Sequence, residues 1–501
     1  MINVSQTQQP FWNNQADGYV IFIKDDLTSL DGQNLLNDIE QKHYPHLKKI
    51  FTHHQFKGNC GQSFVLSAMD NDQLIHFIFV GVGKVNRSST QEVEMLRRAL
   101  AEAIRQQKKL TLKTLVASLP EFTAAPYDLA KQLTIAAHMA SYECSKFKSD
   151  KKEAPFEGSL LFVTDEKTCA PAIADGNIIG QAINMARDWA DTPGNILTPT
   201  ELSLHAATLA QKHNLKHTIF GRDKAIELGM GAFLAVDAGS DQDGKFVVLE
   251  YKAQEKDAPT IALCGKGVTF DSGGISLKPS NSMTGMKFDM SGAAAVIAVM
   301  DIIAHLKPAV NVICAAPMVE NMPSGKAARQ DDVVTAMNGK TIEIKNTDAE
   351  GRLILADALC YVEKNYHPDI MIDIATLTGA CAYALGHFYS AVITPDKELA
   401  TTLEAIGAAT GDRVWELPFD DDFKASNKSD IADVSNSGSP AYLAGTITAG
   451  CFLHNFVDKA RWAHLDIAGT AHDVPAINYV GKGSTGAGIR LLTEFILAYK
   501  K

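Results

Sequence analysis

The chain has 501 residues, of which 46% are hydrophobic and 21% are charged, a composition typical of a soluble globular protein. Its length predicts two or three domains. The net charge of −11 and the pI near 5.8 disfavour general binding to nucleic acids or to acidic membranes, so neither is an expected partner.

The cysteines and the N-terminus indicate the compartment. The eight cysteines are scattered with no Cys-x-x-Cys pair, and several lie in apolar runs, as buried thiols do. The first 18 residues lack the basic and apolar regions of a signal peptide. No apolar run of 18 residues is evident, so no membrane span is expected. We therefore expect a cytoplasmic protein.

The first third of the chain alternates between strand-like and helix-like segments. Apolar runs typical of strands occupy 19–23, 76–82, 114–117 and 159–163, and runs typical of helices occupy 92–106 and 125–142. This alternation predicts a compact α/β domain over residues 1–165.

A long helix is predicted next, over 172–191, with one polar and one apolar face. Thr192-Pro193-Gly194 ends it, because Pro and Gly break helices. We interpret 166–194 as a linker helix. Helices and strands alternate again from Glu201 to the end, so 195–501 is predicted to form a second, larger domain.

Several polar residues follow a predicted strand in the segment IALCGKGVTFDSGG. The apolar strand 261–264 is expected to open into a Gly-rich loop that carries Lys266 and Asp271. Lys278 follows, and Asp289 stands just before an Ala-rich helix. Taken singly, a loop lysine is usually solvated, and an Asp before a helix is usually its N-cap.

The octapeptide NTDAEGRL, residues 346–353, is the most informative in the chain. The residues before it, 341–344, alternate as a strand does, and 353–359 has the apolar density of a buried helix. In open α/β sheets, ligands bind where a strand passes into a helix. Three charged side chains are expected in this turn: Asp348, Glu350 and Arg352.

The acidic residues of these two segments suggest a metal centre. Four carboxylates in one pocket would repel one another, and two divalent cations would balance them. Carboxylates with a nitrogen or two suit Mn²⁺, Mg²⁺ or Zn²⁺. Metals paired about 3.5–4 Å apart recur in hydrolytic enzymes. The lysines and Arg352 would then remain to stabilise negative charge on a substrate or transition state.

Three motifs carry a family resemblance. GKGVTFDSGGISLKPS, MKFDMSGAAA and NTDAEGRLILADAL resemble, in order and spacing, the signature segments of the cytosol (leucyl) aminopeptidase family. The resemblance covers most of 184–495, including ATLTGA and WAHLDIAG, and is weak in the N-terminal third. It implies that 195–501 is a catalytic α/β/α sandwich with a mixed sheet, of the zinc-exopeptidase type. A smaller N-terminal α/β domain would precede it.

The resemblance also implies roles for the charged residues. One metal, Mn²⁺ or Zn²⁺, would be held by Lys266, Asp271, Asp289 and Glu350, and a second by Asp271, Asp348 and Glu350. Lys278 resembles the catalytic lysine that polarises the scissile carbonyl. Arg352 resembles the arginine that seats a bicarbonate ion, the general base for the water between the metals.

A pocket for the first side chain of the substrate is implied by the same resemblance. The matching positions are Met286, Thr376, Gly379, Ala468 and Ala471. For Met286 the simpler alternative is core packing. The implied activity is removal of N-terminal Leu, Met or other apolar residues from peptides. Family members usually form homohexamers whose active sites face an inner cavity.

Two alternatives to an aminopeptidase are a DNA-binding regulatory protein and an inactive structural homologue. The acidic net charge disfavours the first, and the presence of all five ligand residues disfavours the second. Gly339-Lys340-Thr341 superficially resembles the end of a phosphate-binding loop, but the preceding glycine of that motif is absent. Asn338-Gly339 is better interpreted as a hairpin turn.

Overall fold

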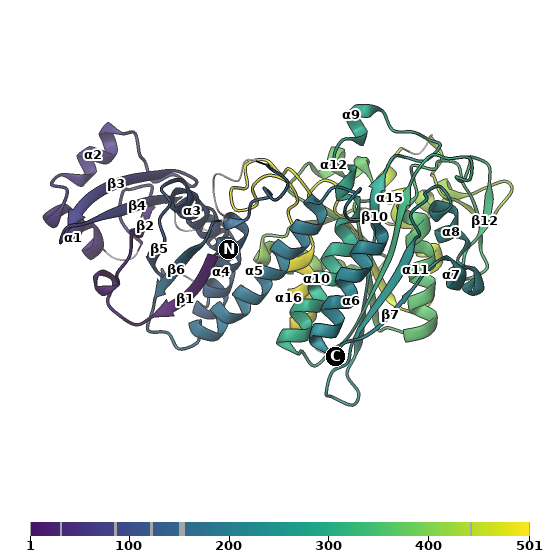
Figure 1. Cartoon of the computed structure of the whole chain (residues 1–501), viewed down its shortest axis with the longest axis horizontal. Helices are drawn as coiled ribbons and strands as arrows, with labels where there is room; N and C mark the ends of the chain where they lie inside the picture. Colours follow the sequence, from purple (N-terminus) through teal and green to yellow (C-terminus); the bar gives the residue numbers. More distant parts are fainter. Residues whose placement is uncertain are drawn as a thin grey trace. The chain divides into compact units, whose positions relative to one another are not determined.

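The computed structural model describes residues 2–30, 33–84, 88–120, 124–149, 156–440 and 443–499. The chain divides into two compact units, each of α/β structure (Figure 1). Unit 1 comprises Met1–Asn184 and Pro475–Gly481. Unit 2 comprises Met185–Val474 and Lys482–Lys501.

Unit 1 contains a six-stranded sheet with the order β1-β6-β5-β2-β4-β3. Neighbouring strands are parallel, except that β3 is antiparallel to β4. The strands are β1 (Ile2–Thr7), β2 (Gly18–Lys24), β3 (Ser63–Asp70), β4 (Gln73–Gly83), β5 (Thr114–Ser118) and β6 (Gly158–Val163). The helices are η1 (Phe11–Asn13), α1 (Gln33–Lys42), α2 (Leu47–His53), α3 (Ser89–Lys109) and α4 (Pro126–Ser141).

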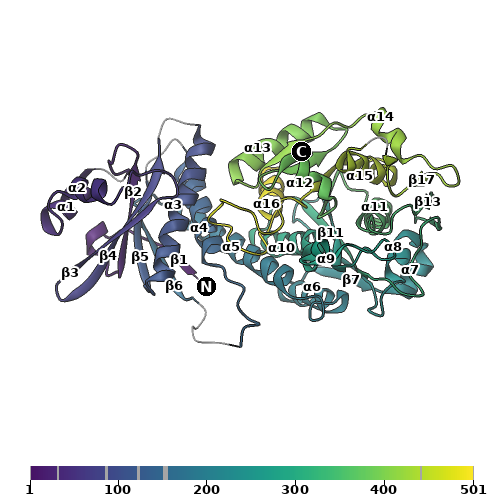
Figure 2. The same cartoon turned by 90° about the horizontal axis from the view of Figure 1, so that it is seen from above.

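Helices cover both faces of this sheet, as Figure 2 shows. Side chains of a strand alternate between faces, so Val20 and Phe22 of β2 pack in a core with α3 and α4. Ile21 and Ile23 pack in a second core with α1 and α2. All six segments predicted in this region are present, whereas β1, β3, α1 and α2 were missed.

Helix α5 (Cys169–Asp191) connects the two units, and the division between them falls after Asn184. A short segment near the C-terminus belongs to unit 1. There Asn478 Nδ2 donates to the carbonyl oxygen of Arg98 at 3.0 Å, and Arg105 donates to the carbonyl oxygen of Asn478 at 2.7 Å. The domain boundaries proposed after residues 165 and 194 stay a prediction.

Unit 2 contains a nine-stranded mixed sheet with the order β16-β15-β18-β14-β9-β11-β8-β7, and β10 pairs with β11. A smaller sheet has the order β12-β13-β17. The strands are β7 (Lys216–Phe220), β8 (Lys245–Tyr251), β9 (Thr260–Gly265), β10 (Gly267–Asp271), β11 (Asn311–Asn321), β12 (Val333–Thr335), β13 (Thr341–Glu343), β14 (Ile370–Ala375), β15 (Ser390–Ile393), β16 (Val414–Glu416), β17 (Val434–Ser435) and β18 (Arg461–Asp466).

The larger helices of unit 2 form two layers. One layer packs on one face of the sheet: α6 (Pro199–His213), α10 (Ser291–Leu306), α13 (Lys397–Thr410) and α16 (Ile489–Ala498). The other face is covered by α8 (Gly231–Asp237), α11 (Gly351–Tyr366) and α15 (Gly445–Leu453). The shorter helices are α7 (Arg222–Leu228), α9 (Ser280–Met283), η2 (Met286–Met290), α12 (Gly379–Leu385), α14 (Asp421–Lys424), η3 (Ala425–Asn427) and η5 (His454–Phe456). The α/β/α sandwich is therefore confirmed.

The protein interior contains a long apolar helix and six cysteines. Met286–Leu306, which includes α10, is long and apolar enough to cross a membrane, whereas no such segment was expected from the sequence. However, 89% of its most apolar window is buried inside the protein, as in the core helix of a globular fold. Six cysteines are buried thiols, as expected: Cys169, Cys264, Cys314, Cys360, Cys381 and Cys451.

Candidate active site

Five strands of unit 2 bring polar residues to one end of the large sheet. Strands β9, β10, β11, β14 and β18 are linked as parallel neighbours, so their carboxyl ends point the same way. In open α/β sheets this is the edge at which ligands bind. The residues at or just after these ends are Lys266, Asp271, Asn321, Thr376 and Asp466. The prediction of a loop at Asp271 was wrong, because residues 267–271 form the strand β10.

Lys266 is buried, and oxygen atoms surround its ammonium group. Its Nζ lies 2.9 Å from Oδ1 of Asp289 and 2.8 Å from Oε1 of Glu350. It also donates to the carbonyl oxygen of Thr376 at 2.9 Å. Burial lowers the pKa of this lysine, but the neighbouring carboxylates outweigh burial and raise the pKa above its ordinary value. To ligate a metal, Lys266 must lose its proton, which a nearby dication favours.

Lys278 connects two other predicted ligands. Its Nζ lies 2.8 Å from Oδ2 of Asp271 and 2.5 Å from Oδ1 of Asp348. Burial opposes the charge of the lysine, yet these carboxylates and Glu350 raise its pKa above the ordinary value. The structure therefore brings both lysines and all four acids into one cluster.

Asp271 and Asp289 are held by donors from neighbouring strand ends. Oδ1 of Asp271 accepts hydrogen bonds from the backbone N–H of Gly273 and from Asn321 Nδ2, both at 2.8 Å. Oδ1 of Asp289 accepts one from the hydroxyl of Thr376 at 2.8 Å. Asp289 is not the N-cap of α10, because that position is occupied by Met290. The N-cap alternative for Asp289 is therefore wrong, and its role as a metal ligand stays a prediction.

The cluster has the donors and the unmet charge that divalent cations require. One carboxylate oxygen from each of Asp271, Asp348 and Glu350 lies within 4.8 Å of the others. Oδ2 of Asp289 is buried and has no hydrogen-bond partner among the described residues. Burial raises the pKa of Asp289 well above its usual range, although Lys266 opposes this. A buried polar atom without a partner is costly, and a cation would supply one. The residues therefore fit a metal centre.

Asn436 holds the NTDAEGRL loop in place, and sequence reasoning missed it. Its Nδ2 donates to the carbonyl oxygen of Asn346 at 2.7 Å, and its Oδ1 accepts from the backbone N–H of Lys345 at 2.9 Å. The loop then enters α11, whose N-cap position is Glu350. The predicted strand, turn and helix around these ligands are confirmed, and the hairpin turn at Gly339 joins β12 to β13 as expected.

Arg352 is buried in the first turn of α11. Its Nη1 donates to the carbonyl oxygen of Asn436 at 2.8 Å, and its Nε has no partner in the described parts of the chain. Burial lowers the pKa of the guanidinium to about 10, while Glu350 and Asp466 favour its charge. Arg352 is therefore still a cation at neutral pH, with a donor left for an anion.

The predicted pocket residues lie on three segments of the chain at this edge of the sheet. Thr376 contacts both Lys266 and Asp289, as described above. Met286 is half-buried in η2, three residues before Asp289. Gly379 is exposed at the start of α12, with open space where a side chain would begin. Ala468 is half-buried, whereas Ala471 is only 1% exposed.

Asp466 organises the loops that carry these pocket residues, and its role was also missed. Its Oδ1 accepts from the backbone N–H groups of Leu377 and Ala468, each at 3.1 Å, and its Oδ2 accepts from the hydroxyl of Thr378 at 2.6 Å. The residue lies inside the quoted segment WAHLDIAG. No local pattern there distinguishes it from any other buried acid.

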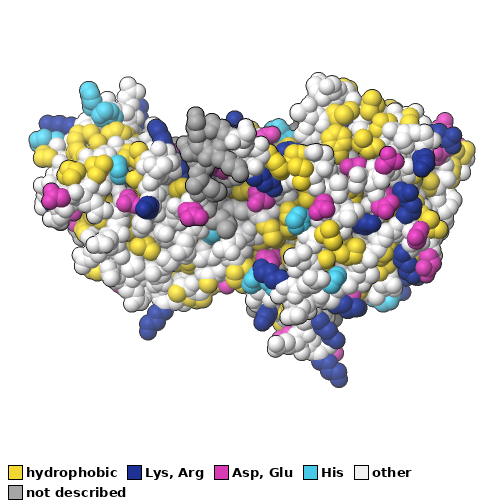
Figure 3. Space-filling model, viewed as in Figure 1, with side chains coloured by type: hydrophobic (Ala, Val, Ile, Leu, Met, Phe, Trp, Pro, Cys, Tyr) yellow, Lys and Arg dark blue, Asp and Glu magenta, His cyan; other side chains and the backbone are white. Residues whose placement is uncertain are grey.

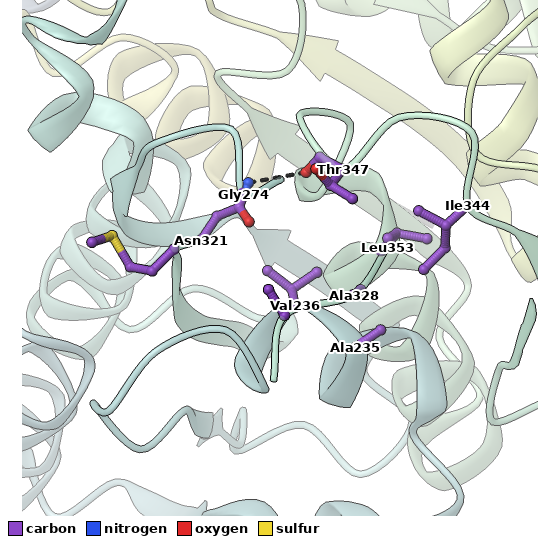
Figure 4. A pocket seen from close by; sticks show the side chains of 10 residues that line it. Ala235, Val236, Gly274, Asn321, Ala328, Ile344, Thr347 and Leu353 are labelled. Carbon is purple, nitrogen blue, oxygen red and sulfur yellow. Dashed lines mark hydrogen bonds between the residues drawn. The ribbon is translucent and has the colours of Figure 1, made fainter. Parts of the chain in front are cut away.

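A small cavity lies beside the loops that carry Gly274 and Thr347 (Figure 4). It has a volume of about 10 Å³, room for one water molecule. Its wall includes Gly274 and Thr347 but is otherwise mainly apolar, with Val236, Ile344 and Leu353. The cavity is too small for an amino acid, so we assign it no substrate.

Family models and curated relatives both identify the family of this chain. The family model "Cytosol aminopeptidase family, catalytic domain" matches 184–493, and the N-terminal domain model of the same family matches 20–151. The probable cytosol aminopeptidase of Rickettsia felis is 38% identical over 505 residues, covering 100% of both chains. That of a Geobacter species (strain M21) is 40% identical over 446 residues, covering 88% of this chain and 89% of the relative.

Solved structures show the same relationship. The bottromycin maturation enzyme BotP is 30% identical, with a TM-score of 0.83 and coverage of 97% of this chain and 99% of that protein. Its complex with Mn has a TM-score of 0.84 and the same identity and coverage. The chain therefore belongs to the cytosol aminopeptidase family, peptidase family M17, whose members are metal-dependent aminopeptidases that hydrolyse peptide bonds.

Proposed function

We propose that this chain is a two-metal aminopeptidase that releases Leu, Met and other apolar residues from the N-termini of peptides. The observation that carries the proposal is the convergence of four carboxylates and two lysines, most of them buried, at the carboxyl edge of the sheet. A structural role alone would not require four acids whose mutual repulsion must be overcome.

One metal would be held by Lys266, Asp271, Asp289 and Glu350, and the other by Asp271, Asp348 and Glu350. The proximity of the last three carboxylates and the partnerless Oδ2 of Asp289 support this allocation. Bound there, two Mn²⁺ or Zn²⁺ ions would polarise the scissile carbonyl and activate water. The complex of the relative BotP with Mn supports Mn²⁺.

The cationic side chains would act on the substrate directly. Lys278 is only partly buried and would donate from its ammonium to the carbonyl oxygen as negative charge develops there. Arg352 would hold a bicarbonate ion through the Nε donor that is left over. The bicarbonate would accept a proton as general base. Asn436 and Asp466 would position the loops without touching the substrate.

Recognition of a free N-terminus would depend on the metals, whose charge balances that of the carboxylates. A free amine that has lost its proton offers a metal a lone pair and the carboxylates its remaining N–H groups, whereas the nitrogen of an acetylated N-terminus has no such lone pair. The half-buried Met286 and the open space above Gly379 would leave room for an apolar first side chain. Thr376 and Ala468 would border it, and Ala471 would form its floor.

The experiment compares Leu-p-nitroanilide with N-acetyl-Leu-p-nitroanilide after loading the protein with Mn²⁺ or Zn²⁺. We expect cleavage of the first and none of the second. Equal cleavage of both substrates would refute the proposed recognition of a free amine. A series of aminoacyl-p-nitroanilides then measures the preference for Leu and Met over charged residues.

We also propose a cytoplasmic homohexamer, on the resemblance to the family alone. Light scattering should give about six times the chain mass of 54.1 kDa, and a monomer with full activity would exclude the assembly. A DNA-binding role gains no support, because Lys and Arg are interspersed with Asp and Glu on the face in Figure 3. The inactive-homologue alternative is disfavoured by the presence of every proposed ligand.

A further inference from the structure

A second group of potential metal ligands lies in unit 2, outside the active site. His213 is the last residue of α6, and Asp301 and His305 lie one turn apart near the end of α10. One ligand atom from each of the three residues lies within 4.8 Å of the others. The two imidazole rings meet edge to face, with centroids 4.5 Å apart. Helices α6 and α10 lie side by side in Figures 1 and 2.

The group is partly enclosed and already linked by hydrogen bonds. Nε2 of His213 lies 2.7 Å from Oδ1 of Asp301. The side chains of His213 and Asp301 are only 10% and 11% exposed, whereas that of His305 is 35% exposed. Two ligands are therefore held in place by the fold, and the third is accessible to an ion arriving from solvent.

His305 makes the hydrogen bond that histidine ligands usually make. Its Nδ1 lies 2.8 Å from the carbonyl oxygen of Asp301, which can only accept, so Nδ1 must carry the proton. In the neutral form of the ring, Nε2 is then the nitrogen with the lone pair. Metal-bound histidines commonly donate their other ring N–H to a backbone carbonyl in this way.

The electrostatic surroundings favour a cation. Both α6 and α10 end within one residue of a histidine of this group, and the C-terminus of a helix carries partial negative charge. Asp301 adds a full negative charge. Lys212 also contacts Asp301, with Nζ 3.4 Å from Oδ1. However, the side chain of Lys212 is 62% exposed and can turn into solvent.

We propose that His213, Asp301 and His305 form a second binding site for a divalent transition metal, with Zn²⁺ as the favoured ion. Two imidazoles and one carboxylate suit Zn²⁺, Co²⁺ or Ni²⁺, whereas Mg²⁺ and Ca²⁺ prefer oxygen ligands alone. A bound ion would replace the hydrogen bond between His213 and Asp301 and would hold α6 against α10. Water would complete the coordination.

This site is separate from the active site. Asp289 stands before the start of α10, and Asp301 follows it by 12 residues, which corresponds to roughly 18 Å along a helix. The function of the ion would be structural, because it would link α6 to α10 at this distance from the active site. The inference does not depend on the proposed two-metal mechanism.

The test compares wild-type protein with His305→Gln, chosen because the exposed side chain can be replaced without disturbing the core. Both proteins are dialysed against the same micromolar Zn²⁺, and bound zinc is measured by mass spectrometry. We expect wild type to retain one more equivalent per chain. Zinc bound at the active site is expected in both proteins, so it does not contribute to the difference in zinc content between them. His217→Gln, an exposed histidine on β7, is the matched control and should equal wild type.

Thermal unfolding provides an independent readout. Zn²⁺ should raise the Tm of wild type and of His217→Gln more than that of His305→Gln, and Mg²⁺ should not reproduce the difference. Hydrolysis of Leu-p-nitroanilide by His305→Gln should match wild type. Equal zinc content and equal Tm shifts in all three proteins would overturn the proposal and leave the cluster as a hydrogen-bonded link between two helices.

Discussion

Gly351 leaves the space that the side chain of Lys266 occupies. A Cβ on Gly351 would lie 2.6 Å from both Cδ and Cε of Lys266 and 2.7 Å from its Nζ. These distances are too short for carbon contacts, and Lys266 is only 3% exposed and bound at three oxygen atoms. The lysine therefore cannot move aside without leaving the cluster of carboxylates.

Gly351→Ala should displace Lys266 and remove one proposed ligand, while α11 itself favours Ala over Gly. We expect metal content to fall and kcat to drop at least tenfold, with helix content unchanged by circular dichroism. The tenfold figure is a lower estimate for disturbing the support of a metal ligand. Gly325→Ala, at a glycine with open space around it, is the control. Normal metal content in Gly351→Ala would contradict the packing argument.

Glu350→Gln should remove the negative charge shared by both proposed metal sites and by Lys266. We expect loss of bound metal and a decrease in kcat of roughly a hundredfold or more. Glu255→Gln, at an exposed loop position, should behave as wild type. Metal analysis after chelation and reloading with Mn²⁺ measures the effect. A variant that retains two metals would show that Glu350 is not shared.

Lys278→Ala tests a different function, because this lysine is proposed to act on the carbonyl oxygen rather than on the metals. We expect metal content to be retained and kcat to fall roughly a hundredfold, the scale for removing one such donor. Lys252→Ala, in an exposed loop, serves as the control. If kcat is normal, Lys278 merely balances the charges of Asp271 and Asp348.

The raised pKa of Asp357 predicts how the stability of the folded protein depends on pH. This fully buried carboxylate of α11 accepts from the backbone N–H groups of Phe233 at 2.8 Å and Met337 at 2.7 Å. Burial raises its pKa from 3.8 to about 7, against the effect of these hydrogen bonds. Between these two values the folded state binds more protons than the unfolded state, so this group's contribution to stability falls as pH rises.

The corresponding variant is Asp357→Asn, whose amide does not titrate. It should have a lower Tm, because one backbone N–H loses its acceptor. The Tm difference between wild type and variant should be larger at pH 5 than at pH 8. The increase should be roughly 2–4 °C for each kcal/mol of unfolding free energy that depends on the ionisation of Asp357. Scans of both proteins under identical metal conditions measure it. A difference that stays constant with pH would contradict the raised pKa.

The sequence was most informative where the polar residues and the elements that carry them are close together in the chain. Strand, ligands and helix follow one another within residues 341–359, so hydrophobic periodicity alone predicted the setting of Asp348 and Glu350. The family motifs predicted the remaining ligands, and the structure brings all of them together. Their roles in metal binding and catalysis stay predictions for the variants above.

Local sequence patterns did not predict two segments whose partners are distant in the chain. Strand β1 has two buried apolar residues, Ile2 and Val4, in a polar segment, and it forms because it pairs with β6, more than 150 residues away in the chain. A segment of this kind has almost no periodicity. Likewise, nothing near Asn478 indicates that it belongs to unit 1, because its partners lie on α3.

The sequence by itself determined the strands and helices with strong apolar periodicity. Through the family motifs it also determined the sandwich class and the segments that carry the proposed ligands. Tertiary structure alone decided which distant side chains hold those segments. Asn436 is 84 residues from Arg352, and Asp466 is 89 residues from Leu377. The physical reason is that the loops must satisfy their buried backbone groups, and the partners come from whichever strand ends pack beside them.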